Sequence, residues 1–521
     1  MYKKFLCCLL AVALMLVSGG ARLILSVDAD SISGTDAGSL GTITTMNDFA
    51  DDCVMVVLTH EASLQFIDYT PADFPELECA EIDDLSSAKG AKVQAVLRGD
   101  QLEMNTIGAR FMNQNIDVEG FRRILCLKLA NPGKGNVLRA VMALEQREDV
   151  YFAEPNYVVQ PMAVVLPDMP STDYAWGADK IQLDDAWDFV TNESSVLVGV
   201  VDSGIDVNHP DLNGRVSTSL SKNFTGDSKS ATYDGLGHGT HVAGIIGARG
   251  VADNFVKGVC QNVTLVSLRV LSDEPATPTY YSTIADAIDY AEEKGIPILN
   301  LSLDATGAGL TRLQEAIFRF SGLLICSIGN TGINVENGSG SEPAVWDYDH
   351  IISVGASTAS DTRESNSNYG RTKTDLFAPG ENIVSCYPAN RCSSSNCTAA
   401  GHISYRYHAI SGTSQAAPFV TGVAALILSS HPNVSRVTVK NAILNSVDSV
   451  SAFSNICVSG GRLNAYNAIC YSALHHNSAY YDAYNSSKHW KYCNRCNYSV
   501  LENHIMDASG QCYLCYYPNN T

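Results

Sequence analysis

The stretch "VLVGVVDSGIDVNHPDL", residues 196–212, begins with an apolar run that stops at Asp202. A short apolar run without polar alternation is typical of a strand that is buried on both faces of a parallel sheet. Four more runs of this kind follow along the chain: "TLVSLRVL" (264–271), "IPILNLSL" (296–303), "LLICSIGN" (323–330) and "HIISVGAS" (350–357).

Helical patterns separate these runs. The clearest is "STIADAIDYAEEKG", residues 282–295, which has apolar residues at 284, 287, 288 and 291. Its expected N-cap is Ser282 and its expected stop is Gly295. Alternating strands and helices predict a doubly wound α/β domain with a parallel sheet, in which functional sites gather at the carboxyl ends of strands.

The chain begins with "MYKKFLCCLLAVALMLVSGGA", in which two lysines precede an apolar run and then small residues. The run is too short to span a bilayer, and the layout is that of a secretory signal peptide. We assign residues 1–29 to this signal. The sequence therefore predicts a secreted, extracellular protein that keeps no membrane span once the signal is removed.

Three further regions follow the signal. Residues 30–165 contain a small α+β unit, with strand patterns at 122–130 and 150–161 and a helix pattern at 135–149. A Pro-rich linker, residues 161–170, leads to the main domain, residues 171–470. Residues 471–521 form a polar, Tyr-rich spacer and a module with two Cys-x-x-Cys pairs.

The formal net charge of −21 disfavours nucleic acid and anionic lipid as partners, because both carry negative charge. The 16 cysteines matter in an exported chain, where disulfides persist, but their pairing cannot be deduced from sequence.

Three reactive side chains lie at junctions rich in small residues: Asp202, His238 in "GHGTHVAGIIG", and Ser414 in "ISGTSQAAPFVTG". Each alone has an ordinary structural explanation, and Ser414 is a good helix N-cap. Together they offer what a serine nucleophile needs, namely a histidine base and a carboxylate that orients the base.

The segments "VVDSGIDVNHPDL", "GHGTHVAG" and "SGTSQAAP" resemble the three signatures of the subtilisin-like serine proteases (subtilases), in the same order Asp, His, Ser. Smaller matches, including "SLRVL", "LNLSL", "SIGN" and "GRLNAYNAI", extend the resemblance over residues 171–467. It implies a seven-stranded parallel sheet with helices on both faces. It also implies a monomeric serine endopeptidase that cuts peptides and proteins through an acyl-enzyme and needs no cofactor for catalysis.

The resemblance also implies residue roles. Ser414 is the nucleophile as well as a helix cap, His238 the general base and acid, and Asp202 the orienting carboxylate. Asn330 supplies a side-chain donor to the oxyanion hole, and His241 matches a structural histidine. The walls of the pocket for the residue before the scissile bond are Leu301, Ser302, Leu303, Asp304, Ser327 and Gly329, with Glu342 near its base.

The small unit resembles the inhibitory prodomain of these proteases, a ferredoxin-like α+β fold whose C-terminal tail lies in the substrate cleft. The resemblance thus predicts a self-processing zymogen that is inhibited by its own prodomain. One departure from the family is Gln415, which stands where methionine is usual. We expect activity to survive this change because the chemistry does not use the sulfur.

Two metal sites are candidates. Asp211 matches a family calcium ligand, and Asn254 could add another oxygen. The tail cysteines have the spacing of a zinc ribbon, although two disulfides are the alternative in an exported protein. These cysteines are Cys493, Cys496, Cys512 and Cys515.

Two other functions compete with the protease. One is a catalytically silent secreted binding protein that uses the C-terminal cysteine module; the intact set of Asp202, His238, Ser414 and Asn330 argues against it. The other is a zinc-ribbon nucleic-acid binder, which the signal peptide and the acidic charge oppose.

Overall fold

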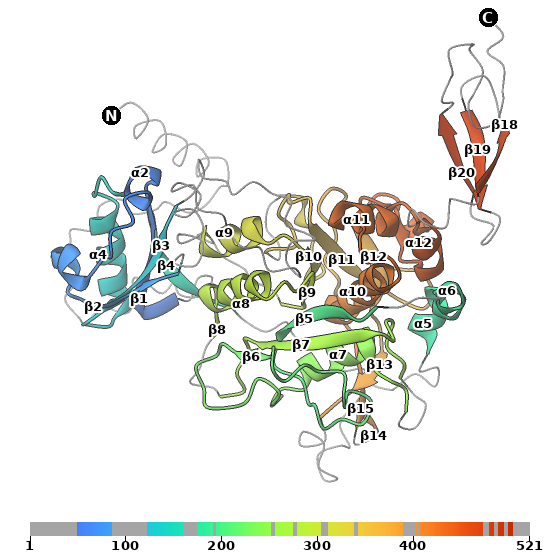
Figure 1. Cartoon of the computed structure of the whole chain (residues 1–521), viewed down its shortest axis with the longest axis horizontal. Helices are drawn as coiled ribbons and strands as arrows, with labels where there is room; N and C mark the ends of the chain where they lie inside the picture. Colours follow the sequence, from blue (N-terminus) through green and yellow to red (C-terminus); the bar gives the residue numbers. More distant parts are fainter. Residues whose placement is uncertain are drawn as a thin grey trace, which may run out of the picture.

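The computed structural model describes residues 49–85, 122–159, 175–190, 194–251, 256–274, 279–303, 311–337, 342–388, 402–404, 406–471, 479–483, 488–493 and 499–503. Within these ranges the chain forms an N-terminal α+β unit, a large central α/β part and a small C-terminal sheet (Figure 1). The predicted signal peptide and the linker 161–170 lie outside the described residues.

The central sheet has nine strands in the order β16-β17-β12-β11-β10-β9-β5-β7-β6. All neighbours are parallel except β16 and β17. The strands are β5 (Val196–Asp202), β6 (Lys222–Asn223), β7 (Val263–Arg269), β9 (Ile298–Leu301), β10 (Leu323–Ser327), β11 (Ile351–Ser357), β12 (Leu376–Pro379), β16 (Asp448–Ser449) and β17 (Gly461–Arg462). The five predicted strands are therefore confirmed, and the seven parallel strands from β12 to β6 are extended by the short β17 and β16.

Helices cover both faces of this sheet (Figure 1). On one face a core joins the sheet to α7 (His238–Gly247), α10 (Thr413–Ser430), α11 (Arg436–Leu444) and α12 (Ala465–Tyr471). On the other face a second core contains α8 (Tyr281–Glu293) and α9 (Thr311–Arg319). In β10, Leu323 and Ile325 enter the first core, whereas Leu324 and Cys326 enter the second. Burial on both faces explains why these strands are continuously apolar.

Two helix starts differ from the prediction. The N-cap of α8 is Tyr280 rather than Ser282, whose hydroxyl accepts a hydrogen bond from Asn156 Nδ2 at 2.7 Å. The N-cap of α10 is Gly412, which has no side chain that could cap the helix. Ser414 is the second residue of α10, so the prediction that it caps the helix is wrong.

The N-terminal unit is an antiparallel sheet of β1 (Phe49–Leu58), β2 (Cys79–Asp84), β3 (Ile124–Leu129) and β4 (Val150–Val159), in the order β2-β3-β1-β4. Helix α4 (Lys134–Leu144) packs on β1 and β4, and α2 (His60–Ser63) follows β1. The sheet continues into the central part, because β8 (Thr279–Tyr280) pairs antiparallel with the end of β4.

The remaining elements are short. No helix among the described residues is long and apolar enough to cross a membrane. The remaining short elements are η2 (Pro71–Asp73), η3 (Pro75–Leu77), α5 (Trp176–Lys180), α6 (Leu183–Phe189), η5 (Val335–Asn337), β13 (Ile383–Cys386), β14 (His402–Ser404), β15 (Tyr407–Ile410), η7 (Ser451–Phe453), β18 (Ala479–Ala483), β19 (Lys488–Cys493) and β20 (Ser499–Asn503).

Candidate active site

The candidate site lies at the carboxyl edge of three neighbouring strands. Strands β10, β9 and β5 are adjacent in the sheet, and the chain leaves them at Ile328, Ser302 and Ser203. The direction of strand order also reverses here, since β7 follows on one side of β5 and β9 on the other. Such a switch point is where open α/β sheets bind ligands.

Asp202 and His238 form a buried pair. Asp202 is the last residue of β5, and His238 is the first residue of α7. His238 Nδ1 lies 2.9 Å from each carboxylate oxygen of Asp202. The close approach needs Gly239, because a Cβ there would lie 2.2 Å from the carbonyl oxygen of Gly204. Since Nδ1 faces the carboxylate, Nε2 is the ring atom left to accept a proton.

The charge of His238 is set by two opposing effects. Burial disfavours the imidazolium, but the carboxylate of Asp202 and, to a smaller extent, that of Asp234 together outweigh burial and raise the pKa of His238. Nε2 of His238 is buried and has no hydrogen-bond partner among the described residues. The pair thus provides a base that its carboxylate orients and stabilises once it is protonated.

Ser414 lies in the first turn of α10, which packs against α7. Ser302 Oγ donates to the carbonyl oxygen of Ser414 at 3.0 Å, and Ser414 Oγ lies 3.4 Å from the carbonyl oxygen of Ser302. Ser414 is thereby attached to the segment that follows β9. The N–H of Ser414 lies in the first turn of α10, where the helix dipole favours an anion.

Asn330 is oriented by the same helix start. Its Oδ1 accepts hydrogen bonds from the N–H of Thr413 at 2.8 Å and from Thr413 Oγ1 at 2.9 Å. Thr413 Oγ1 in turn accepts the N–H of Gly329 at 3.1 Å. Because these bonds fix the amide oxygen, Nδ2 is on the opposite side as the donor group of the side chain.

The residues expected to line the substrate pocket are mostly buried. The side chains of Leu301 and Leu303 belong to the apolar core around α8 and α9. Ser327 Oγ donates to the carbonyl oxygen of Leu301 at 3.3 Å. A substrate at these positions would therefore meet backbone more than side chains. Glu342 is partly exposed, and Asp304 lies outside the described residues.

His241 is separate from the pair. Its Nε2 lies 3.0 Å from the carbonyl oxygen of Ile383 and 3.1 Å from that of His408, so it donates between them. Burial, together with the nearby His238, lowers the pKa of His241 to about 3. A neutral histidine fixed between carbonyls suits a structural role.

The expected calcium ligand Asp211 is fully buried. Its carboxylate accepts the N–H of Val251 at 2.7 Å and the hydroxyl of Tyr407 at 2.5 Å. Asn254 lies outside the described residues, as do Cys496, Cys512 and Cys515, while Cys493 ends β19.

Asp211 also lies beside His209 and Cys386, a group with the chemistry of a metal site. Both ring nitrogens of His209 are engaged in hydrogen bonds, to the N–H of Asp211 at 3.2 Å and the carbonyl oxygen of Arg406 at 2.9 Å. In this structure, His209 and Asp211 are therefore held by hydrogen bonds to protein groups.

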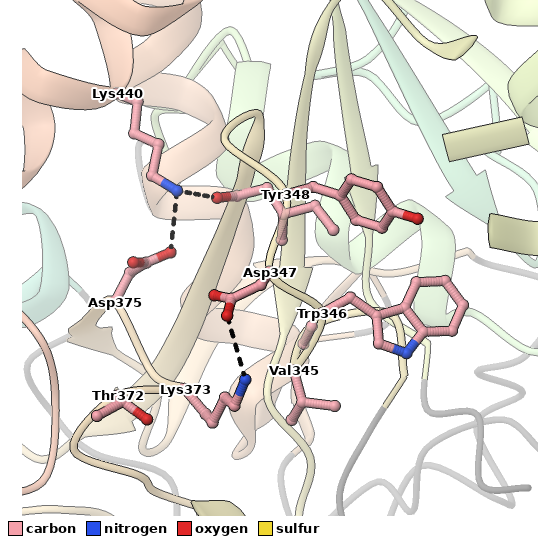
Figure 2. A pocket seen from close by; sticks show the side chains of 10 residues that line it. Val345, Trp346, Asp347, Tyr348, Thr372, Lys373, Asp375 and Lys440 are labelled. Carbon is pink, nitrogen blue, oxygen red and sulfur yellow. Dashed lines mark hydrogen bonds and ion pairs between the residues drawn. The ribbon is translucent and has the colours of Figure 1, made fainter. Parts of the chain in front are cut away.

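A small polar cavity lies away from these residues. It is lined by Trp346, Tyr348, Lys373, Asp375 and Lys440 among others (Figure 2). Asp375 and Ile351 adjoin the beginnings of β12 and β11, so this cavity lies at the end of the sheet opposite to the candidate site. None of the predicted catalytic residues lines it.

Comparison with known proteins identifies the family of the chain. Residues 193–464, more than half of the chain, match the subtilase family of peptidases. A thermophilic serine proteinase of Bacillus sp. (strain AK1) is 34% identical over 343 residues, which are 65% of this chain and 77% of the relative. Thermitase of Thermoactinomyces vulgaris is 33% identical over 299 residues, covering 57% of this chain and 96% of thermitase.

The fold is also that of a solved structure, the epidermin leader peptide processing serine protease (EpiP) of Staphylococcus aureus. The TM-score is 0.51 with 20% sequence identity, over 80% of this chain and 97% of that one. The chain belongs to the subtilase family and is a subtilisin-like serine endopeptidase.

Proposed function

We propose that Ser414, His238 and Asp202 are the catalytic triad of this endopeptidase. The observation that carries the proposal is the buried pair of Asp202 and His238, at 2.9 Å, beside the helix start that bears Ser414. His238 Nε2 takes the proton of Ser414 Oγ as this oxygen attacks the peptide carbonyl. His238 then gives the proton to the leaving amine, and a water molecule hydrolyses the acyl-enzyme by the same route.

Two donors stabilise the oxyanion in this proposal, Asn330 Nδ2 and the backbone N–H of Ser414. The hydrogen bonds from Thr413 to Asn330 Oδ1 support the assignment, because they fix the amide before the substrate arrives. A preorganised donor is most effective when negative charge develops on the oxygen that it faces.

The test is hydrolysis of casein together with labelling by a serine-directed phosphonate. We expect hydrolysis by the purified mature protein and a single label on Ser414, both absent from Ser414→Ala. A folded protein with neither activity nor label would favour the silent binding protein. Label on another serine would contradict the assignment of the nucleophile.

The N-terminal unit acts in this proposal as an inhibitory prodomain with a ferredoxin-like fold. The strand order β2-β3-β1-β4 with α4 on one face supports this assignment, and so does the pairing of β4 with β8. The protein is made as a secreted zymogen that cuts itself between Gln160 and Ser171. Ser414→Ala should then accumulate as a precursor that has lost only its signal. Mature N-termini at the same place in this variant would assign the cut to another protease.

Metal ions would be structural in this proposal. Calcium would bind at Asp211 with the loop of Asn254, and zinc at the four tail cysteines. Metal analysis of the full secreted chain and of a chain that ends after Tyr471 separates the two sites. Thiol titration of the tail after denaturation distinguishes zinc thiolates from disulfides, since disulfides yield no thiol without a reductant.

A further inference from the structure

A second buried carboxylate lies beside the pair of Asp202 and His238. Asp234, in the loop before α7, is 2% exposed. Its Oδ1 accepts from Ser203 Oγ at 2.9 Å, Leu236 N at 3.1 Å and Gly237 N at 2.7 Å. Its Oδ2 accepts from the N–H of Thr240 at 2.9 Å and from Thr240 Oγ1 at 2.6 Å. Burial raises the pKa of Asp234, and the hydrogen bonds from its five donating partners oppose this effect by favouring the ionised carboxylate.

These hydrogen bonds connect the two catalytic segments. Ser203 directly follows Asp202, and its N–H donates to Asp202 Oδ1 at 2.7 Å. The hydroxyl of Ser203 donates to Asp234 and accepts the N–H of Gly239 at 2.9 Å. Gly239 is the residue after His238. One carboxylate thus binds both the strand end that bears Asp202 and the helix turn that bears His238.

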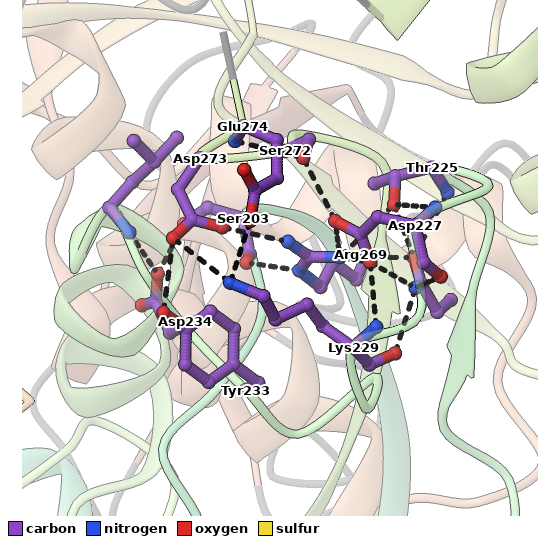
Figure 3. Close-up of polar contacts among 12 residues, drawn as sticks. Ser203, Thr225, Asp227, Lys229, Tyr233, Asp234, Arg269, Ser272, Asp273 and Glu274 are labelled. Carbon is purple, nitrogen blue, oxygen red and sulfur yellow. Dashed lines mark hydrogen bonds and ion pairs between the residues drawn. The ribbon is translucent and has the colours of Figure 1, made fainter. Parts of the chain in front are cut away.

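Ser203 is also held from behind by a buried arginine. Arg269 Nε donates to the carbonyl oxygen of Ser203 at 3.1 Å, and Arg269 Nη1 pairs with Asp227 at 2.8 Å. Figure 3 shows Ser203 between Asp234 on one side and Arg269 on the other. The backbone beside the catalytic carboxylate therefore has fixed partners on both sides.

We propose that Asp234 is a positioning residue for the catalytic pair, which it aligns through Ser203 and through the first turn of α7. The inference rests on the proposed triad and deepens it. Asp234 also places a second negative charge near the imidazolium. Three titratable groups act on His238: Asp202 from β5, Asp234 from the preceding loop and His241 from α7 itself.

The test compares the mature enzyme with Asp234→Asn, Ser203→Ala and the control Asp375→Asn. Asp375 is a suitable control because it is also a carboxylate with few solvent contacts, bonded to Ser353 N at 2.9 Å and paired with Lys440 at 3.6 Å (Figure 2). It lies at the opposite end of the sheet. The kcat of Asp375→Asn therefore shows what the removal of a largely buried charge does when that charge is far from the candidate site.

We expect Asp234→Asn to lower kcat roughly 10- to 100-fold while KM stays within about twofold, because the catalytic groups are misaligned rather than removed. The acid limb of its kcat/KM profile should move to lower pH, since less negative charge faces the imidazolium. Ser203→Ala keeps the charge, so it should lower kcat without moving this limb. Asp375→Asn should change neither quantity.

A merely structural role would lower kcat without moving the acid limb in Asp234→Asn, and this result would overturn the inference. A kcat for Asp234→Asn that equals that of the control would overturn it as well. If Asp234→Asn does not fold, Ser203→Ala and Ser203→Thr decide: Ser203→Thr keeps the hydroxyl that bonds to Asp234 and should restore kcat, and equal kcat losses in both variants would overturn the inference.

The low-field Nδ1 proton resonance of His238 gives a readout that does not need turnover. It should titrate at lower pH in Asp234→Asn than in the parent chain. Absence of hydrolysis by the parent would count against the proposed function only, whereas an unmoved titration would count against Asp234.

Discussion

His238 and His241 lie three positions apart at the start of one helix, yet their surroundings give them different chemistry. His238 faces a carboxylate, which favours the protonated ring. His241 faces carbonyl oxygens of Ile383 and His408, which hold a neutral ring that donates from Nε2. The partner of Nδ1 or Nε2, rather than the histidine itself, decides which ring can exchange protons.

We expect His238→Ala to abolish turnover except for the contribution of the oxyanion hole and substrate binding, a residual roughly 10³- to 10⁴-fold above water. His241→Ala should keep measurable kcat but unfold at lower temperature. Steady-state kinetics and thermal unfolding of the two variants test this contrast. A His241→Ala enzyme that folds as well as His238→Ala and is less active would reverse the assignment.

His241 should also make the fold sensitive to acid. Its pKa is about 3 in the folded chain, whereas an unfolded histidine titrates near 6.5. As the pH falls below about 6.5 the unfolded chain binds a proton that the folded chain refuses, so stability is lost at up to about 1.4 kcal/mol per pH unit until the folded pKa is reached. In a Ser414→Ala background, His241→Asn should make the denaturant midpoint depend less on pH between about pH 6 and about pH 4. If the denaturant midpoint falls equally steeply as the pH falls in chains with and without His241→Asn, this account is contradicted.

Gln415 stands where the subtilases usually have methionine, and we expect it to lower the unfolding free energy. It is 1% exposed, and its Nε2 has no hydrogen-bond partner among the described residues. Gln415→Met keeps the length of the side chain and removes the buried donor. We expect a gain of about 1 kcal/mol in unfolding free energy with kcat within about twofold. Loss of stability would show that the amide has a partner.

The sequence was enough to propose Ser414, His238 and Asp202 as nucleophile, base and carboxylate, because these residue types have distinctive settings. It could not single out Asp234 or Ser203, whose types are common in turns. Their role depends on bonds between segments that are about 30 residues apart, and these exist only in the folded chain.

At the scale of elements, apolar runs predicted β5, β7, β9, β10 and β11 because each is buried on both faces. Strand β12, which has four residues like β9, was not predicted. Strands β6, β16 and β17 have two residues each, too few for a pattern to form. The helix starts were harder. Tyr280 is an N-cap because its extended backbone lies just before the first turn of α8. Gly412 precedes α10 with a positive φ of 146°, a conformation that favours glycine over serine.

The contact of β4 with α8 depends on Asn156. Its Nδ2 donates to Ser282 Oγ at 2.7 Å, and its Oδ1 lies 3.5 Å from the N–H of Ser282 in the first turn of α8. Asn156→Ala in the separately produced N-terminal unit should weaken inhibition of the mature enzyme about 5- to 10-fold, as loss of one or two hydrogen bonds implies.

Arg139→Ala, an exposed change on α4, is the control for this inhibition assay. It should leave the inhibition constant unchanged, because α4 packs on the N-terminal sheet itself. If the N-terminal unit with Asn156→Ala folds and inhibits as well as the parent unit, the contact of Asn156 with Ser282 does not contribute to inhibition.

At the scale of the whole molecule, the N-terminal unit and the central part share one sheet through β4 and β8. The two small apolar cores of the unit also meet the central part, since Tyr280 packs in one of them and Tyr157 joins the other to the core around α8. These contacts could not be predicted from sequence, because β8 has only two residues and its partner strand is more than 100 residues away.

The shared sheet has a kinetic consequence. While the chain is intact, the tether holds the unit on the enzyme at an effective concentration of the order of millimolar, whatever the amount of protein in solution. If the linker is cut as proposed, the same contacts must survive as a two-component complex, which dilution dissociates. Release of activity should therefore quicken on dilution, whereas the first cut should proceed at the same rate in dilute and concentrated samples. The lag before hydrolysis of a chromogenic peptide, followed over a dilution series, measures both steps. Under the proposed self-cleavage, dilution would thus be the step that frees the enzyme from its inhibitory unit.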